Sequence, residues 1–246
     1  MSSQPRLVEV RQNILKQNDL LARSLRQRFE DAGVFVVSMV SSPGAGKTTL
    51  LEQTLTRLRD KGCRVAALVG DLATENDAAR LARSQAPVKQ IVTGTVCHLD
   101  ADMVERSLSD WQLDELDCLF IENVGNLVCP SSYDLGENLR IVLMSVTEGE
   151  DKPAKYPTIF NTADVALITK IDLAEAVEFD REAAGRSIES VRPGMQVREV
   201  SAKTGVGLDD FVDWLESQVA GRVALGSGGS RSEKSGGKPT FLTAGK

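Results

Sequence analysis

The residues best suited to chemistry begin with the run SSPGAGKTT at residues 41–49, between an apolar segment and an amphipathic one. The run follows the phosphate-loop pattern G-x-x-x-x-G-K-S/T, except that Ser41 replaces the first glycine. Backbone N–H groups of such a loop surround phosphate oxygens at the start of a helix. We expect Lys47 to reach the β and γ phosphates and the Thr48 hydroxyl to bind Mg²⁺. The expected nucleotide contacts of this loop are Gly44, Ala45, Gly46, Lys47, Thr48 and Thr49.

Two acidic residues are placed to complete a magnesium site. Asp71 ends one apolar run and Glu122 ends another. Because ligands bind at the carboxyl ends of the strands in an open α/β sheet, we expect both acids at the nucleotide. Together with Lys47 and Thr48 they form the expected catalytic set; the alternative is that either acid only caps a strand. Glu122 and Gly125 also resemble the D-x-x-G switch of GTPases, with Glu in place of Asp.

A second pair of motifs indicates which base is bound. TKID at 169–172 and SAK at 201–203 each follow an apolar run, and they resemble the N-K-x-D and S-A-K motifs by which GTPases hold guanine. A carboxylate at Asp172 would accept from guanine N1–H and N2–H₂, whereas adenine would leave it unpaired. We therefore expect GTP and GDP rather than adenine nucleotides, although Thr169 replaces the usual Asn. The expected base contacts are Lys170, Asp172, Ser201, Ala202 and Lys203.

The residue after the switch glycine bears on the rate of hydrolysis. Signalling GTPases often carry a Gln there that orients the attacking water. Here Gly125 is followed by Asn126, which has a shorter side chain. We expect slow intrinsic GTP hydrolysis.

Soft metal ligands occur close to the same predicted strand ends. Cys97 precedes His98, the only histidine of the chain, and Cys129 lies on the short segment that follows Glu122. Thiolate and imidazole ligands suit Ni²⁺ or Zn²⁺ rather than Mg²⁺. Three ligands would leave a fourth position open, which suits metal transfer better than a structural site. The spacing alone also allows a structural histidine and free buried cysteines.

These residues need a scaffold that brings strand ends together. Apolar runs predict strands at 34–40, 64–69, 88–93, 117–121, 140–146, 165–169 and 195–200. Amphipathic segments predict helices at 48–60, 76–84, 100–109, 180–191 and 208–219. Continuous apolar runs indicate strands buried on both faces, and their alternation with helices indicates a mainly parallel sheet between helical layers. The expected fold class is α/β, a P-loop NTPase in a single domain.

The ends of the chain differ from this pattern. Apolar residues at helical spacing predict an amphipathic helix over residues 1–32, closed by Gly33 and packed on the domain. The alternative is a separate arm that binds a partner. The GTPase domain is expected over residues 33–221, followed by a Gly/Ser-rich disordered tail over residues 222–246.

Composition excludes several classes of protein. The 246 residues carry a formal charge of −6, which disfavours a nucleic-acid partner. No apolar run is long enough to span a bilayer, and we see no secretion signal, so we expect no membrane partner. Four cysteines form no disulfide framework and fit a reducing cytoplasm. Cys63 and Cys118 are expected to be structural.

The blocks GDLATENDA, TGTVCHLDADM, IENVGNLVCP and SVTEGEDKP, together with the phosphate loop, resemble the hydrogenase maturation GTPase HypB family. The resemblance implies a GTP-hydrolysing metallochaperone that assists nickel insertion into the large subunit of NiFe-hydrogenase. It assigns Cys97, His98 and Cys129 to a metal site that holds Ni²⁺ or Zn²⁺. It also implies a homodimer favoured by GTP, the small nickel chaperone HypA as a partner, and the hydrogenase large-subunit precursor as a client.

Some family members add a cysteine-rich N-terminal motif or a histidine-rich stretch, whereas no cysteine precedes Cys63 here. We therefore expect nickel delivery rather than nickel storage. Three alternatives stay open: a urease-type nickel-insertion GTPase, a cofactor-loading GTPase for a cobalamin-dependent mutase, and a passive metal-binding protein with an inactive P-loop.

Overall fold

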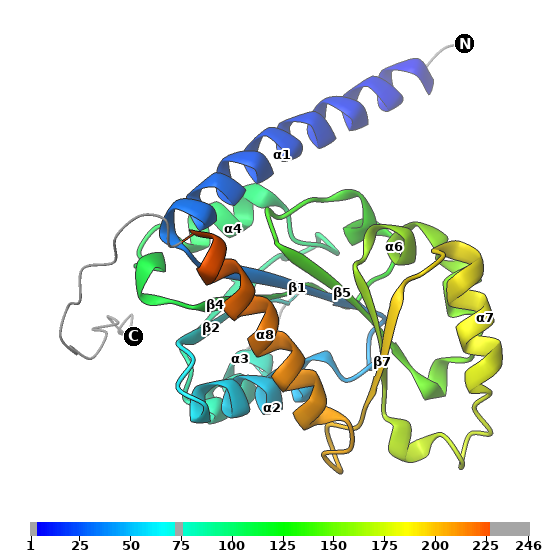
Figure 1. Cartoon of the computed structure of the whole chain (residues 1–246). Coiled ribbons are helices and arrows are strands. Elements are labelled where there is room, and N and C mark those ends of the chain that lie inside the picture. The colour runs from blue at the N-terminus through cyan, green and yellow to red at the C-terminus, as the bar shows by residue number, and fades with distance from the viewer. Residues whose placement is uncertain (1–3, 72–75, 227–246) are drawn as a thin grey trace.

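The protein is described by a computed structural model that places residues 4–71 and 76–226, with side chains for 12–71 and 77–221. Its centre is a seven-stranded sheet in the order β3-β2-β4-β1-β5-β6-β7, in which every neighbouring pair is parallel (Figure 1). The strands are β1 Phe35–Ser41, β2 Val65–Asp71, β3 Val88–Val92, β4 Cys118–Glu122, β5 Leu139–Ser145, β6 Val165–Thr169 and β7 Gln196–Val200. The predicted α/β class and the seven predicted strands are confirmed, with bounds that differ by at most two residues.

The helices that alternate with these strands are mostly those predicted. They are α1 Gln4–Ala32, α2 Lys47–Asp60, α3 Asn76–Leu81, α4 Ala101–Ser107, α5 Lys152–Lys155, α6 Pro157–Thr162, α7 Arg181–Val191 and α8 Leu208–Gly226. Single 3₁₀ turns lie at η1 Ala82–Ser84, η2 Leu113–Glu115, η3 Cys129–Ser132, η4 Val146–Glu148 and η5 Ile171–Leu173.

The helices differ from the sequence prediction in three main respects. The single helix predicted over residues 76–84 is split into α3 and η1. Helix α8 runs on to Gly226, so the tail predicted from residue 222 begins too early; residues 227–246 of that predicted tail lie outside the described residues. Helices α5 and α6 were not predicted, because each is shorter than two turns and shows no helical periodicity.

Successive side chains of the central strand β1 pack into hydrophobic cores on opposite faces of the sheet. Val37 and Met39 of β1 pack with residues of α2 and α8 on one face. Val36 packs with residues of α1 and α4 on the other face, and Val40 joins residues of α6 and α7 there. The period-two alternation of a strand that is buried on both sides explains this division. The sheet is thereby fixed between helical layers, and its carboxyl edge carries the loops described below.

Helix α1 packs on the sheet through side chains of its second half. Leu25 and Phe29 are buried, whereas Ile14 is 49% exposed. Figure 1 shows the first half of α1 projecting beyond the body of the domain. Gly33 closes the helix at φ 70°, and the Val34 N–H donates to the Phe29 carbonyl at 3.1 Å, as the predicted C-cap requires. The helix is thus anchored at its C-terminal end, and its other end projects from the domain (Figure 1).

Among the described residues, no helix combines the length and apolar character needed to cross a bilayer. Cys118 is fully buried in β4, and Cys63 packs against the core that contains α2 and α8. Burial raises the pKa of the Cys63 thiol to about 11, which keeps it protonated. These two cysteines are structural, as expected.

Candidate functional site

The phosphate loop connects the buried end of β1 to α2. Gly44 has φ 76° and Gly46 has φ 94°, the left-handed conformation that glycine adopts without strain. Gly46 stands directly before Lys47, the first residue of α2. The Lys47 ammonium donates to the Ser41 hydroxyl at 3.0 Å, so Ser41 supplies an acceptor at the position where the pattern has glycine. Burial lowers the pKa of Lys47, against the opposing pull of Glu122.

Glu122 lies directly beneath the start of α2. The Thr48 hydroxyl donates to Glu122 Oε1 at 2.7 Å, which joins the first turn of α2 to the end of β4. Glu122 is 3% exposed, and its Oε2 is buried with no hydrogen-bond partner among the described residues. Loss of solvation raises the pKa of Glu122 to about 7, although Lys47 and Thr48 pull it down. Glu122 Oε2 thus has no hydrogen-bond donor in the described part of the chain and lies beside a threonine hydroxyl. A carboxylate oxygen and a hydroxyl oxygen are ligands that fit Mg²⁺.

Asp71 ends β2 at the same edge of the sheet. Strands β2 and β4 are adjacent and parallel, with Val69 opposite Glu122, so Asp71 extends beyond Glu122 in the same direction. The Asp71 charge is among the smaller causes that raise the pKa of Glu122. The structure therefore brings together Lys47, Thr48, Glu122 and Asp71, as the sequence predicted.

The loop after β6 is tied to the phosphate loop. The Thr169 hydroxyl donates to the Ala45 carbonyl at 2.7 Å, and the Lys170 ammonium donates to the Gly44 carbonyl at 2.7 Å. Lys170 takes a left-handed conformation, with φ 57°. Thr169, which replaces the Asn of the usual motif, is 4% exposed and uses its side chain to hold the phosphate loop. Thr169 is thus part of the junction between the two loops.

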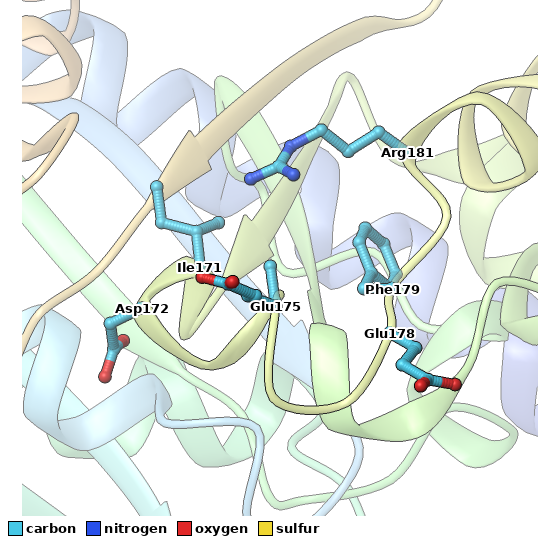
Figure 2. A pocket seen from close by; sticks show the side chains of 7 residues that line it. Ile171, Asp172, Glu175, Glu178, Phe179 and Arg181 are labelled. Carbon is cyan, nitrogen blue, oxygen red and sulfur yellow. The ribbon is translucent and has the colours of Figure 1, made fainter.

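The two predicted base motifs meet at Asp172 and Ser201. The Ser201 hydroxyl donates to Asp172 Oδ1 at 2.6 Å and accepts from the Thr204 N–H at 3.1 Å. Asp172 is exposed on one side of a shallow pocket, opposite Phe179 and Glu178 (Figure 2). Ala202 is half-buried and Lys203 is exposed, so the second motif also reaches solvent at this point. The carboxylate is oriented by Ser201 and stays accessible.

The three soft ligands converge on one point. The ligand atoms of Cys97, His98 and Cys129 all lie within 4.8 Å of one another, and each residue is half-buried. The two sulfur atoms are 2.9 Å apart, and both cysteines are free thiols. The Nδ1 atom of His98 is buried with no hydrogen-bond partner among the described residues. Burial lowers the pKa of His98, which keeps the imidazole neutral and able to ligate a metal.

This arrangement is matched by known proteins. A family model described as "CobW/HypB/UreG, nucleotide-binding domain" matches residues 35–199. The hydrogenase maturation factor HypB of Azotobacter chroococcum mcd 1 is 47% identical over 223 residues, which cover 90% of this chain and 72% of that protein. The chain belongs to the HypB family.

Solved HypB structures share the fold. HypB from Helicobacter pylori, crystallised in complex with nickel, matches with a TM-score of 0.79 at 40% identity, covering 84% of this chain and 97% of that one. HypB from Archaeoglobus fulgidus matches with a TM-score of 0.77 at 38% identity, covering 83% of this chain and 99% of that one.

Sequence reasoning missed the groups that surround the metal triad of this HypB-family chain. The Tyr133 ring packs on the His98 ring, with centroids 3.9 Å apart and planes at 30°. Asn123 and Asn126 also bond to the segment that carries Cys97 and His98. No periodicity or motif marks a contact between two loops, so only the position of Tyr133 shortly after Cys129 could have suggested it.

Proposed function

We propose that this chain is a GTP-hydrolysing metallochaperone that assists nickel insertion into the large subunit of NiFe-hydrogenase. The observation that carries the proposal is the single segment 122–129, which begins at the carboxylate under Thr48 and ends at a thiol of the metal triad. Its relatives named as hydrogenase maturation factors, and a relative crystallised with nickel, support the cargo and the pathway.

Nucleotide binding is assigned to residues at the carboxyl edge of the sheet. The Lys47 ammonium would leave Ser41 for the β and γ phosphates, whose negative charge would offset the cost of burying the ammonium. Thr48, Glu122 and Asp71 are the groups that would hold Mg²⁺, which when bound neutralises charge on those phosphates. The Asp172 carboxylate, oriented by Ser201, would accept from both guanine donors, and Lys170 would lie along the base.

The metal triad is assigned to cargo rather than to structure. Cys97, His98 and Cys129 supply two thiols and one neutral imidazole, which suit Ni²⁺ or Zn²⁺. Three ligands from one chain leave a coordination position for a second subunit or for the protein that receives the metal. This supports a homodimer favoured by GTP, with HypA and the hydrogenase large-subunit precursor as exchange partners. The thiols must remain reduced to bind metal, which the cytoplasm provides.

Hydrolysis is expected to be slow. The Asn126 amide donates to the Cys97 carbonyl at 3.3 Å, so this side chain already has a partner away from the nucleotide. The residue that would orient water in a signalling GTPase is therefore not available for that task. Single-turnover cleavage of GTP measures the rate, and a rate equal to that of an activated GTPase would contradict this expectation.

The two halves of the function are joined by the segment 122–129. GTP with its magnesium would fix Glu122 and promote dimerisation, and hydrolysis would release both, so the metal affinity at Cys129 would change with the nucleotide. Thermodynamic linkage then requires nickel to change nucleotide affinity or dimerisation by the same factor.

The deciding experiment is a nickel titration of the protein with GDP or with a non-hydrolysable GTP analogue. It follows the thiolate-to-nickel charge-transfer absorption, with a Cys97→Ala/Cys129→Ala variant as the control. We expect two different nickel affinities that both vanish in the variant. Equal affinities in the two states would refute the coupling, and absence of the thiolate band would refute the metal site.

The alternatives are separated by activity in cells. If the chain were a passive metal-binding protein, its Lys47→Ala variant would still support hydrogenase maturation. The proposed GTPase would lose that function on the same substitution. A urease-type factor would restore urease rather than hydrogenase activity in a strain that lacks its own insertion GTPase.

A further inference from the structure

Two asparagine side chains connect the segments that carry the metal ligands. We name Asn123 and Asn126 the asparagine bridge. Both lie between Glu122 and Cys129, and both bond to the backbone of residues 97–99. Neither is part of the phosphate-binding, magnesium-binding or metal-ligating set described above.

Asn123 forms the buried half of the bridge. It follows Glu122 directly and is 2% exposed. Its Oδ1 accepts from the Leu99 N–H at 3.0 Å and from the Val124 N–H at 2.9 Å. One buried oxygen therefore joins Leu99, which follows His98, to Val124, which follows Asn123. Removing this acceptor would leave two backbone donors to find other partners, which buried N–H groups rarely lack.

Asn126 forms the half closer to the thiols. Its Nδ2 donates to the Cys97 carbonyl at 3.3 Å, and its Oδ1 accepts from the Val128 N–H at 2.9 Å. One side chain thus bonds to a ligand residue and to the neighbour of the other ligand residue. The two thiols are held near each other through a group that is not itself a ligand.

The middle of the same segment also lies close to the phosphate loop. At Gly125 an added Cβ would lie 3.0 Å from Pro43 Cα and 3.1 Å from Pro43 N, so the two backbones are close together there. Between Glu122 and Cys129 the chain therefore lies beside the phosphate loop and is hydrogen-bonded to the Cys97 segment. A shift of the phosphate loop that displaces this segment would act on the hydrogen bonds of the bridge.

From this geometry we infer that Asn123 and Asn126 are positioning residues that make the nickel affinity of the Cys97, His98 and Cys129 site depend on the bound nucleotide. The inference rests on the proposed function. With the bridge intact, the Cys97 segment follows the switch when the nucleotide changes. Without it, Cys129 still moves with the switch, but Cys97 and His98 no longer follow in step. The nickel affinities of the two nucleotide states then approach each other.

The test compares Asn126→Ala and Asn123→Leu with the natural protein. Asn126→Ala removes the bond to the Cys97 carbonyl and the bond from the Val128 N–H at a half-buried site. Asn123→Leu replaces the buried acceptor by an apolar group of similar size. The control is Asn161→Ala, which truncates an exposed amide on α6. For each protein the nickel dissociation constant is measured with GDP and with a non-hydrolysable GTP analogue.

We expect the ratio of the larger to the smaller dissociation constant to fall toward one by up to about fivefold in Asn126→Ala, the effect of the one hydrogen bond that crosses to the Cys97 segment. The ratio should stay unchanged in Asn161→Ala. The thiolate-to-nickel band should persist, since all three ligands remain. GTP affinity should change by less than about twofold. Asn123→Leu should also bring this ratio closer to one. The second variant means that the test does not depend on a single substitution.

Two other outcomes overturn the inference and are distinguishable. If the natural protein shows a ratio other than one and both bridge variants keep it, or if they lower nickel affinity equally in both states, the asparagines have only a structural role while the proposed function stands. If the natural protein itself shows a ratio of one, the nucleotide coupling of the proposed function fails as well.

Discussion

Replacing Glu122 by glutamine tests the central electrostatic feature of the site. The carboxylate is buried, one oxygen accepts only from Thr48, and the other has no hydrogen-bond partner among the described residues. Without nucleotide and magnesium, the ionised carboxylate of Glu122 therefore lacks the hydrogen-bond donors that would stabilise its charge. Burial raises its pKa from the ordinary value of 4.5 to about 7, so the folded protein binds this proton more tightly than the unfolded chain does.

The sign and size of the effect follow from proton linkage. Between pH 4.5 and 7 the folded state holds a proton that the unfolded state has lost, so the free energy of unfolding falls as pH rises through this window. The difference between the two pKa values corresponds to a loss of about 3 kcal/mol by pH 8. Glutamine cannot ionise and avoids this loss, although it also removes the counter-charge of Lys47. The pH dependence, rather than stability at one pH, isolates the effect.

The assay is urea unfolding of nucleotide-free protein at pH 5 and at pH 8, for the natural chain and Glu122→Gln. The free energy of unfolding of the variant should gain about 2–3 kcal/mol relative to the natural chain between pH 5 and pH 8. Glu182→Gln is the control, because the Glu182 side chain is 89% exposed. A difference between Glu122→Gln and the natural chain that does not change with pH would refute the raised pKa.

Three further changes probe other parts of the structure. Asp172→Asn should weaken GTP binding at least about tenfold, because charge-assisted hydrogen bonds to guanine are lost; a titration with a fluorescent GTP analogue measures this, and unchanged affinity would contradict the base assignment. Gly125→Ala should lower nucleotide affinity several-fold with the fold retained, since its Cβ would meet Pro43 at 3.0 Å; normal affinity would show that the phosphate loop tolerates the shift. Phe29→Ala should lower the free energy of unfolding by about 3–5 kcal/mol, measured in urea, because this ring of α1 is fully buried in the core between α1 and the sheet; a loss below about 1 kcal/mol would mean that α1 adds little to the core.

Much of the fold could be predicted from the sequence because buried strands consist mostly of apolar residues. Five of the seven strands have a neighbouring strand on each side and are almost wholly buried, so their runs are mostly apolar and are easily found. The phosphate loop was equally predictable, because its glycines and lysine act locally. The convergence of Thr48 with Glu122 followed from one rule, that parallel strands present their carboxyl ends at one edge.

Other features depend on surfaces that a periodic pattern does not describe. The apolar stripe of α1 includes Ile14, yet among the side chains described from residue 12 onward the first buried one is Asn18. The stripe therefore predicted a helix but not the part of it that the domain covers. Helix α5 begins beside Pro153 and helix α6 begins at Pro157. Both helices are too short to show apolar residues at helical spacing. The contact between Tyr133 and His98 joins two irregular segments, whose conformations are set by tertiary hydrogen bonds rather than by propensity.

The far side of the metal triad is held as firmly as the nucleotide side. On α1 the buried Asn18 donates to the Asp134 carbonyl at 2.9 Å and accepts from the Ala101 N–H at 2.9 Å. Asp134 follows Tyr133 directly, and Ala101 follows His98 by three residues, so one amide fixes the distal ends of both ligand segments. Breaking either bond would leave a buried polar group at a cost of about 1–3 kcal/mol. The ligand segments are thus hydrogen-bonded to α1 at their distal ends and to the asparagine bridge at their proximal ends, so we expect their response to nucleotide to be a small displacement. A small displacement is enough to change a metal centre, because ligand distances in well-formed sites lie within about 0.2 Å of their typical values.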